Sequence, residues 1–235
     1  MITGKLHSVE TFGAVDGPGI RTVFFMQGCP ARCIYCHNPD TWPIGIGDTV
    51  KIKEIVERAK RGRPYYGEDG GVTFSGGEPL LQGEFIIEAM KALKKESIGS
   101  VIDTSGTYFD KFTKEAINQA ELVLLDIKHT DPRIFTEMTQ MSQEPLYEVI
   151  AAVNALHKPI WVRQVIVPGI NDTEKYILSL KEFLKCIKTV AKVELLGYHN
   201  MAVPKYEKLG IPYKLKDVDP MNRKKLEKFK KILDK

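Results

Sequence analysis

The feature that most restricts how this 235-residue chain can fold is a pattern that recurs six times along it. Each unit begins with a short apolar segment, continues through a polar or glycine-rich loop and leads into a segment with the apolar spacing of an amphipathic helix. Strands that alternate with helices in this way build a parallel sheet covered by helices. Because six units are too few to close an ordinary eight-stranded barrel, the sequence predicts an α/β fold, an open partial (β/α)6 barrel of the TIM type.

The expected strands are rich in β-branched and aromatic residues and cover residues 21–26, 72–74, 100–102, 122–125, 160–167 and 193–196. The expected helices cover residues 49–60, 82–95, 109–119, 131–138, 145–157 and 173–187. Thr49 or Asp48 is expected to cap the first helix, and residues 5–14 to form a lead-in strand or hairpin. An amphipathic helix at about 221–234 is expected to pack on the barrel, so that one domain accounts for residues 1–235.

Composition and charge exclude several classes of protein. The net charge of +4 is too small to indicate nucleic-acid binding by itself. No apolar run approaches the roughly 18 residues that a membrane span needs, and the sequence opens without the pattern of a signal peptide. We therefore expect a cytoplasmic protein with neither a nucleic acid nor a membrane as its partner, in a compartment that keeps thiols reduced.

Three of the four cysteines lie together in the loop that follows the first expected strand. Cys29, Cys33 and Cys36 have C-x3-C-x2-C spacing, and thiols this close together hold a soft metal or form a disulfide. A zinc site completed by His37 and a [4Fe–4S] cluster with one iron left open both fit the spacing. Haem attachment through residues 33–37 and a disulfide also fit it, although both suit exported proteins better.

The cysteine spacing, with the aromatic Tyr35 just before the last cysteine, resembles the signature of the radical S-adenosylmethionine enzymes. In that family, three thiolates hold a [4Fe–4S] cluster, and the amino and carboxylate groups of S-adenosylmethionine bind the open iron. The cofactor carries the radical chemistry, while the protein supplies placement and shielding. The resemblance implies that Cys29, Cys33 and Cys36 are the catalytic cluster ligands and that S-adenosylmethionine is the cofactor.

Polar residues follow the expected strands at their carboxyl ends, which face one mouth in a barrel. Glycines let the backbone approach a ligand closely, and Gly76-Gly77-Glu78 resembles the family segment that receives the amino group of S-adenosylmethionine. The resemblance implies further cofactor contacts from the other loops, namely Tyr35, His37, Asp103, Asp126, Lys128, Arg163 and His199. A purely structural salt bridge from Lys128 to Asp126 or Glu78 is the alternative.

A monovalent cation is the third ligand that the sequence suggests. Asp103 and Asp126 end neighbouring expected strands, where an aspartate ordinarily caps the next helix. In the activases of pyruvate formate-lyase, a matching Asp-Thr and Asp-x-Lys help to form a cation site, and oxygen ligands suit Na⁺ or K⁺. The resemblance therefore implies a cation site made by Asp103, Thr104, Asp126 and the backbone of Leu124.

Segments along nearly the whole chain resemble the glycyl-radical-enzyme activases, most of all those that act on pyruvate formate-lyase. These segments are residues 16–21, 35–38, 73–79, 126–128, 167–172 and 195–199. The resemblance implies hydrogen abstraction from a glycine of pyruvate formate-lyase, with a flavodoxin or ferredoxin as the electron donor. Activation of another glycyl radical enzyme, such as anaerobic ribonucleotide reductase, is one alternative. A zinc-binding barrel without redox activity is the alternative from a different class.

The remaining cysteine and two departures from the family pattern refine this expectation. Cys186 is the only thiol outside the loop, so a second cluster lacks ligands, and we expect Cys186 to be structural. Ser105 stands where many of the resembled enzymes have Asn, and residues 200–207 match them loosely. These departures concern the identity of the partner more than the radical chemistry.

Overall fold

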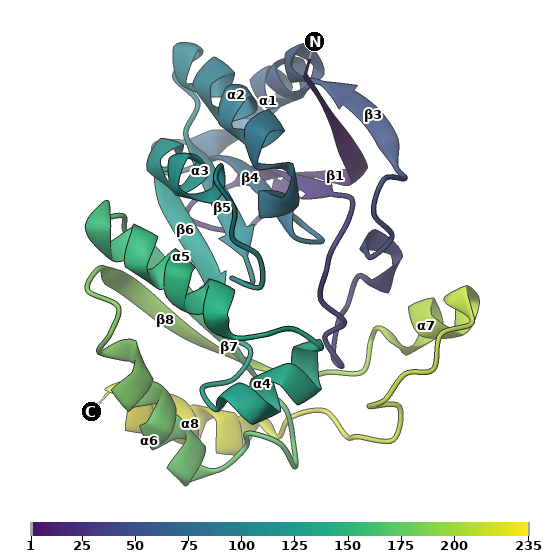
Figure 1. The fold of residues 1–235 in the computed structure, drawn as a ribbon, viewed down its shortest axis with the longest axis vertical. Helices are drawn as coiled ribbons and strands as arrows, with labels where there is room; N and C mark the ends of the chain where they lie inside the picture. Colours follow the sequence, from purple (N-terminus) through teal and green to yellow (C-terminus); the bar gives the residue numbers. More distant parts are fainter. Residues whose placement is uncertain (1, 235) are drawn as a thin grey trace.

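The computed structural model describes residues 2–234, and an eight-stranded, mostly parallel sheet runs through them (Figure 1). The parallel strands are β2 (Arg21–Met26), β4 (Gly71–Gly76), β5 (Ser100–Thr104), β6 (Leu122–Asp126), β7 (Ile160–Ile166) and β8 (Val190–Gly197). Beyond β2, β1 (Thr3–Gly13) and then β3 (Asp48–Lys51) continue the sheet with antiparallel pairing. The strand order runs from β3 to β8 without closing, which confirms the predicted open partial barrel.

Helices follow the strands and most of them cover one face of the sheet, whereas the helix over residues 203–209 lies apart from the sheet (Figure 1). They are α1 (Ile52–Tyr66), α2 (Gly83–Lys95), α3 (Thr113–Gln119), α4 (Pro132–Thr139), α5 (Glu144–Ala155), α6 (Glu174–Leu184), α7 (Val203–Leu209) and α8 (Arg223–Asp234). Two short 3₁₀ turns, η1 (Pro39–Thr41) and η2 (Pro79–Gln82), follow β2 and β4. None of the helices in residues 2–234 is both long and apolar enough to cross a membrane.

The expected helix start at residues 48–49 is wrong. Lys51, Val50, Thr49 and Asp48 pair with residues of β1 and form β3, and α1 begins only at Ile52. The β-branched side chains of Thr49 and Val50 favour a strand once a partner strand is present. The side chain of Glu54 accepts a hydrogen bond from the backbone N–H of Lys51 at 2.8 Å, so Lys51, rather than Thr49 or Asp48, is the N-cap.

Alternation of side chains along the strands separates a face packed under the helices from a face that carries the cavity at its carboxyl end. Val72 and Phe74 of β4 pack with the helices in a cluster of buried apolar residues that includes Ile102 of β5. Ser75 and Asp103 point to the other face and line a cavity. Because successive residues of a strand face opposite sides, apolar burial under the helices, worth about 1.5–3 kcal/mol for a large side chain, fixes which residues reach the cavity.

Candidate active site

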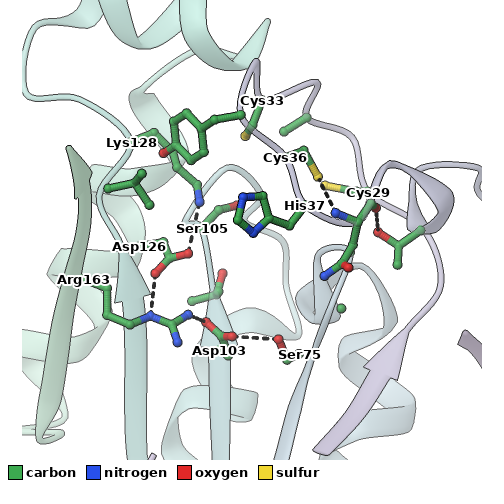
Figure 2. A pocket seen from close by; sticks show the side chains of 18 of the residues that line it. Cys29, Cys33, Cys36, His37, Ser75, Asp103, Ser105, Asp126, Lys128 and Arg163 are labelled. Carbon is green, nitrogen blue, oxygen red and sulfur yellow. Dashed lines mark hydrogen bonds and ion pairs between the residues drawn. The ribbon is translucent and has the colours of Figure 1, made fainter. Parts of the chain in front are cut away.

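A cavity of about 450 Å³ opens at the carboxyl ends of the parallel strands (Figure 2). Its volume lies within the range of about 300–1,000 Å³ that is usual for small-molecule sites. It is lined by all but two of the predicted site residues, namely Cys29, Cys33, Tyr35, Cys36, His37, Gly76, Gly77, Asp103, Thr104, Asp126, Lys128, Arg163 and His199. The two exceptions, Glu78 and Leu124, are fully buried outside it.

The loop that carries Cys29, Cys33 and Cys36, which we call the cysteine loop, is held on two sides by backbone hydrogen bonds to other segments. The N–H of Gly28 donates to the carbonyl of Thr41 at 2.7 Å, and the N–H of Cys29 donates to the carbonyl of Trp42 at 3.2 Å. On the opposite side, the N–H of Arg32 donates to Thr139 at the end of α4 at 2.8 Å. The loop therefore holds its thiols in place without any regular secondary structure of its own.

All three thiols of the loop are free, and burial raises the pKa of each. The nearby ammonium of Lys128 partly opposes this effect at Cys33, whose pKa lies at about 11. At Cys29, the carboxylate of Glu78 adds to the effect of burial and raises the pKa further. Thiols that resist ionisation in this way become ligands when a bound metal stabilises their thiolate form.

Two glycines give the cavity a wall of bare backbone next to this loop. Gly76 has φ of +105°, and a Cβ placed on it would lie 2.4 Å from the backbone nitrogen of Met26. A Cβ on Gly77 would lie 2.2 Å from the carbonyl oxygen of Gly28. Only glycine fits such close approach, so the wall presents backbone groups to any ligand in the cavity.

The side chain of Glu78, which the family resemblance placed among the cofactor contacts, is fully buried and does not line the cavity. Its carboxylate accepts hydrogen bonds from Thr104 Oγ1 at 2.8 Å, Ser105 Oγ at 2.7 Å, Ser105 N at 3.1 Å and Leu80 N at 3.2 Å. Burial raises the pKa of Glu78, and these donors oppose the shift. Glu78 therefore joins the loop after β4 to the loop after β5.

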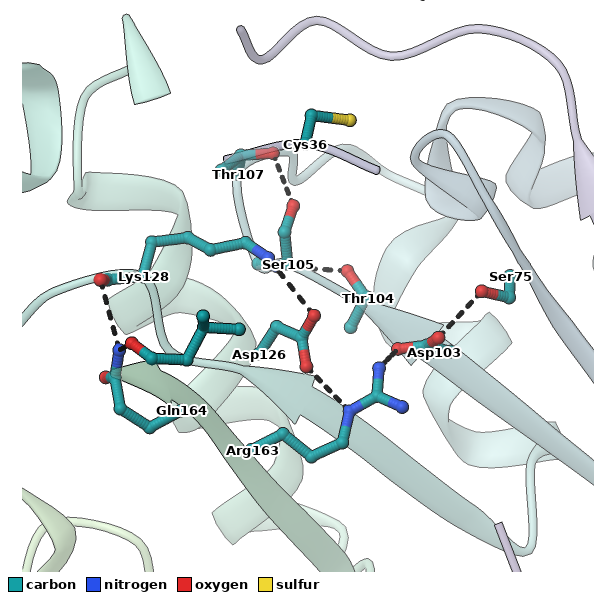
Figure 3. Close-up of polar contacts among 12 residues, drawn as sticks. Cys36, Ser75, Asp103, Thr104, Ser105, Thr107, Asp126, Lys128, Arg163 and Gln164 are labelled. Atoms are coloured by element: carbon teal, nitrogen blue, oxygen red, sulfur yellow. Dashed lines mark hydrogen bonds and ion pairs between the residues drawn. The ribbon is translucent and has the colours of Figure 1, made fainter. Parts of the chain in front are cut away.

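A chain of ion pairs crosses the floor of the cavity (Figure 3). Arg163 donates to Asp126 at 2.7 Å and also to Asp103, while Lys128 donates to Asp126 at 3.1 Å. Burial alone would raise the pKa of Asp126, but Arg163 and Lys128 outweigh burial and lower it to about 2. Ser75 Oγ donates to Oδ2 of Asp103, the carboxylate oxygen that Arg163 does not contact, at 2.7 Å. The structure therefore contains the salt bridge between Lys128 and Asp126 that the sequence analysis gave as the alternative to a cofactor contact.

The strand register explains why these charges meet. Asp126 of β6 and Arg163 of β7 are direct partners in the parallel ladder, and Asp103, the penultimate residue of the adjacent β5, pairs with Leu124, two residues before Asp126. Side chains at such positions stand on the same face of neighbouring strands. The two carboxylates and two cations compensate each other, which is the condition for burying charged groups.

Buried polar atoms without a partner mark the other end of the cavity. Among residues 2–234, Nδ1 of His199 and Oη of Tyr35 are buried and accept or donate no hydrogen bond within the protein. The ring centroids of His37 and His199 lie 4.2 Å apart. Burial lowers the pKa of His37, and the neighbouring His199 lowers it further. Unpaired buried polar atoms are costly, so these two groups are suited to a bound polar ligand.

The residues fit an iron–sulfur cluster better than a zinc ion. In the described part of the chain, no group of three or more His, Cys, Asp or Glu side chains is arranged to hold one metal ion. His37, the fourth ligand of the zinc interpretation, instead lies with Nε2 3.4 Å from the carbonyl oxygen of His199. A cube of iron and sulfide ions separates its protein ligands, whereas a single zinc ion draws four ligands around one point.

Asp16, which was not among the predicted site residues, also lines the cavity. Burial, reinforced by Asp103 and opposed by Arg163, raises the pKa of Asp16 to about 6. The backbone carbonyl of Asp16 accepts a hydrogen bond from Thr73 Oγ1 of β4 at 2.7 Å. Position 16 belongs to the first of the segments on which the family resemblance rests. This was the signal in the sequence that could have identified Asp16 as a site residue.

Comparison with known proteins gives the same picture. The profile of the Radical SAM superfamily matches residues 23–193. A pyruvate formate-lyase-activating enzyme of Clostridium pasteurianum is 45% identical over 99% of both chains, and one of Staphylococcus epidermidis is 41% identical over 94% of this chain and 91% of its own. The crystal structure of a domain of pyruvate-formate lyase-activating enzyme from Bacteroides vulgatus is similar with a TM-score of 0.58 and 26% identity, covering 70% of this chain and 93% of that one.

The raised pKa of Asp16 predicts a specific pH dependence of stability. The folded protein binds the Asp16 proton more tightly than the unfolded chain, whose carboxyl has the ordinary pKa of 3.8. The contribution of Asp16 to the free energy of unfolding is therefore fully present below pH 3.8 and is lost as the pH rises through about 6. We expect the free energy of unfolding in urea, measured on the cluster-free protein, to fall more across this range in the wild type than in Asp16→Asn. Parallel curves for the two proteins would show that the Asp16 pKa is ordinary.

Proposed function

The chain belongs to the radical S-adenosylmethionine superfamily and, within it, to the pyruvate formate-lyase-activating enzymes, and from this membership we propose how its residues install a glycyl radical in a pyruvate formate-lyase. One observation carries the proposal. A single cavity has three thiols at one end, a glycine wall beside them and a buried network of positively and negatively charged side chains at its floor.

Membership of the superfamily implies one [4Fe–4S] cluster and S-adenosylmethionine. When bound, these groups supply a one-electron reduction that breaks a carbon–sulfur bond of the sulfonium and lets the resulting 5′-deoxyadenosyl group take a hydrogen atom from a glycine Cα. Cys29, Cys33 and Cys36 hold the cluster in this proposal. The cysteine loop, fixed on both sides, keeps them in place and limits the access of water.

The remaining lining residues orient the cofactor. The bare backbone at Gly76 and Gly77 accepts the ammonium group, because backbone carbonyls are good acceptors for it. Arg163 and Lys128 offer cations to the cofactor carboxylate at the cavity floor. Tyr35 and His199, whose polar atoms lack partners within the described chain, contact the adenosyl part.

Pyruvate formate-lyase is the protein substrate that the family implies. The electron has to come from outside the chain, and a small one-electron carrier such as flavodoxin or ferredoxin is the donor in this proposal. The names of the two relatives compared above contain pyruvate formate-lyase, and neither contains the alternative substrate, anaerobic ribonucleotide reductase.

The direct test mixes the reconstituted protein with pyruvate formate-lyase, S-adenosylmethionine and dithionite and records the electron paramagnetic resonance spectrum of the mixture. The wild type should produce a glycyl radical signal in the partner. Cys33→Ala should lower its yield at least 1,000-fold, about the loss expected when an essential catalytic group is removed. Cys186→Ala is the matched control, because Cys186 is exposed and does not line the cavity. A wild type that cleaves S-adenosylmethionine but leaves pyruvate formate-lyase without a radical would point to another partner.

A monovalent cation at Asp103, Thr104, Asp126 and the backbone of Leu124 is a further part of the proposal. The support is the position of two carboxylates and a hydroxyl on adjacent strand ends. Both carboxylates bind Arg163 in the structure, so a cation has to compete with that guanidinium for them.

This competition predicts a modest dependence on salt identity. Replacing K⁺ and Na⁺ by tetramethylammonium at constant ionic strength should raise the concentration of S-adenosylmethionine needed for half-maximal cleavage by about tenfold, a change of 1.4 kcal/mol. Asp126→Asn should weaken cofactor binding in every salt and remove the difference between them. Equal half-maximal concentrations in all salts for the wild type would mean that Arg163 and Lys128 balance the two carboxylates without a bound cation.

A further inference from the structure

Helix α7 lies apart from the sheet and packs against η1, the turn that follows the cysteine loop (Figure 1). Its sequence falls within residues 200–207, which match the resembled enzymes only loosely, and the proposed function gives it no role. Two consecutive residues of α7, Lys205 and Tyr206, make contacts on either side of η1. Both contacts lead to the same cysteine of the loop.

That cysteine is Cys36, whose thiol receives hydrogen bonds from two neighbouring residues. The backbone N–H of Asn38 donates to Sγ of Cys36 at 3.4 Å. Trp42 packs with the cysteines in one group, and its side chain supplies the second hydrogen bond to the Cys36 thiol. Burial raises the pKa of Cys36, and these two hydrogen bonds oppose the rise, so both favour the thiolate that a metal binds.

Lys205 holds the first of the two donors in place. Its Nζ donates to Oδ1 of Asn38 at 2.9 Å and to Oδ1 of Asp40 at 3.2 Å. Asp40 is in turn paired with His7 of β1 at 3.1 Å. Lys205 therefore limits the movement of Asn38, and the backbone N–H of Asn38 is the group that donates to Cys36.

Tyr206 holds the second donor in place. Its ring meets the ring of Trp42 edge to face, with the centroids 5.9 Å apart and the planes at 81°, an arrangement that aromatic pairs favour. Tyr206 is itself buried and stacks on Tyr213, with ring centroids 4.4 Å apart. Its hydroxyl has no partner among residues 2–234, so the ring makes the contact that fixes the indole.

From these contacts, and resting on the proposed function, we infer that Lys205 and Tyr206 are positioning residues that raise the reduction potential of the cluster through the two hydrogen bonds to Cys36. Hydrogen bonds to the sulfurs are among the determinants of the potential of an iron–sulfur cluster. They favour the reduced state, because it carries one more negative charge than the oxidised state. Residues that support a metal ligand from behind tune the metal without touching it.

The test is a redox titration of the reconstituted protein, followed by the electron paramagnetic resonance signal of the reduced cluster. In Lys205→Met and in Tyr206→Leu, we expect reduction to become about threefold less favourable, a fall of about 28 mV in the midpoint potential. Because the two residues support different donors, the double variant should combine the shifts to about tenfold, which is about 59 mV for one electron.

Two control variants separate this role from loss of charge and loss of a hydroxyl, and both should keep the potential of the wild type. Lys208→Met removes the same charge from an exposed residue of α7. Tyr206→Phe is the conservative variant, because it keeps the ring and removes only the hydroxyl that lacks a partner within the described chain.

Three results would overturn the inference. The first is an unchanged potential in both single variants at full cluster content. The second is an equal fall in Lys208→Met, which would show that α7 acts through its net charge. The third is an equal fall in Tyr206→Phe, which would assign the effect to the hydroxyl.

If Tyr206→Leu does not take up its cluster, Lys205→Met carries the test, because Lys205 is a partly exposed residue. Failure of the proposed function is distinguishable from failure of this inference. In that case the wild type itself would give no cluster signal to titrate.

Discussion

Glu78 joins three strand ends around the cavity through its backbone and its carboxylate, without lining the cavity itself. The N–H of Glu78 donates to the carbonyl of Gly28 at 2.9 Å, which holds the start of the cysteine loop after β2. Its side chain accepts hydrogen bonds from Thr104 and Ser105 after β5. Hydrogen bonds to a charged group contribute about 1.5–3 kcal/mol each, and removing a buried acceptor leaves its donors unpaired. Glu78 therefore links the start of the cysteine loop and the glycine wall to the end of β5, next to Asp103.

The ion pairs at the cavity floor show how the same fold can bind a zwitterion. Asp103, Asp126, Lys128 and Arg163 sum to zero charge, so burying them together avoids the cost of an isolated buried charge. Each sign is nevertheless available at the cavity surface. The amino acid part of S-adenosylmethionine carries an ammonium and a carboxylate, and it can exchange partners with the network while the total charge of the site stays balanced.

Local patterns in the sequence were sufficient to predict the fold and to single out most of the residues that line the cavity. The parallel strands and the thiol spacing are encoded within a few residues, and strand ends share one mouth. Long-range contacts decided the rest. Thr49 and Val50 form a strand because β1 lies beside them, and Glu78 turns inward because Ser105, far along the chain, offers donors. The cavity position of Asp16 likewise depends on a loop folding back against β4.

In the proposed function, the three thiols hold a cluster whose open iron binds S-adenosylmethionine. The measurement to make is an electron paramagnetic resonance spectrum of anaerobically reconstituted, dithionite-reduced protein, recorded with and without S-adenosylmethionine. We expect the signal of a reduced [4Fe–4S] cluster and a change in its shape when S-adenosylmethionine is added. A protein that takes up stoichiometric zinc and gives no iron signal, or a cluster signal that S-adenosylmethionine leaves unchanged, would contradict it.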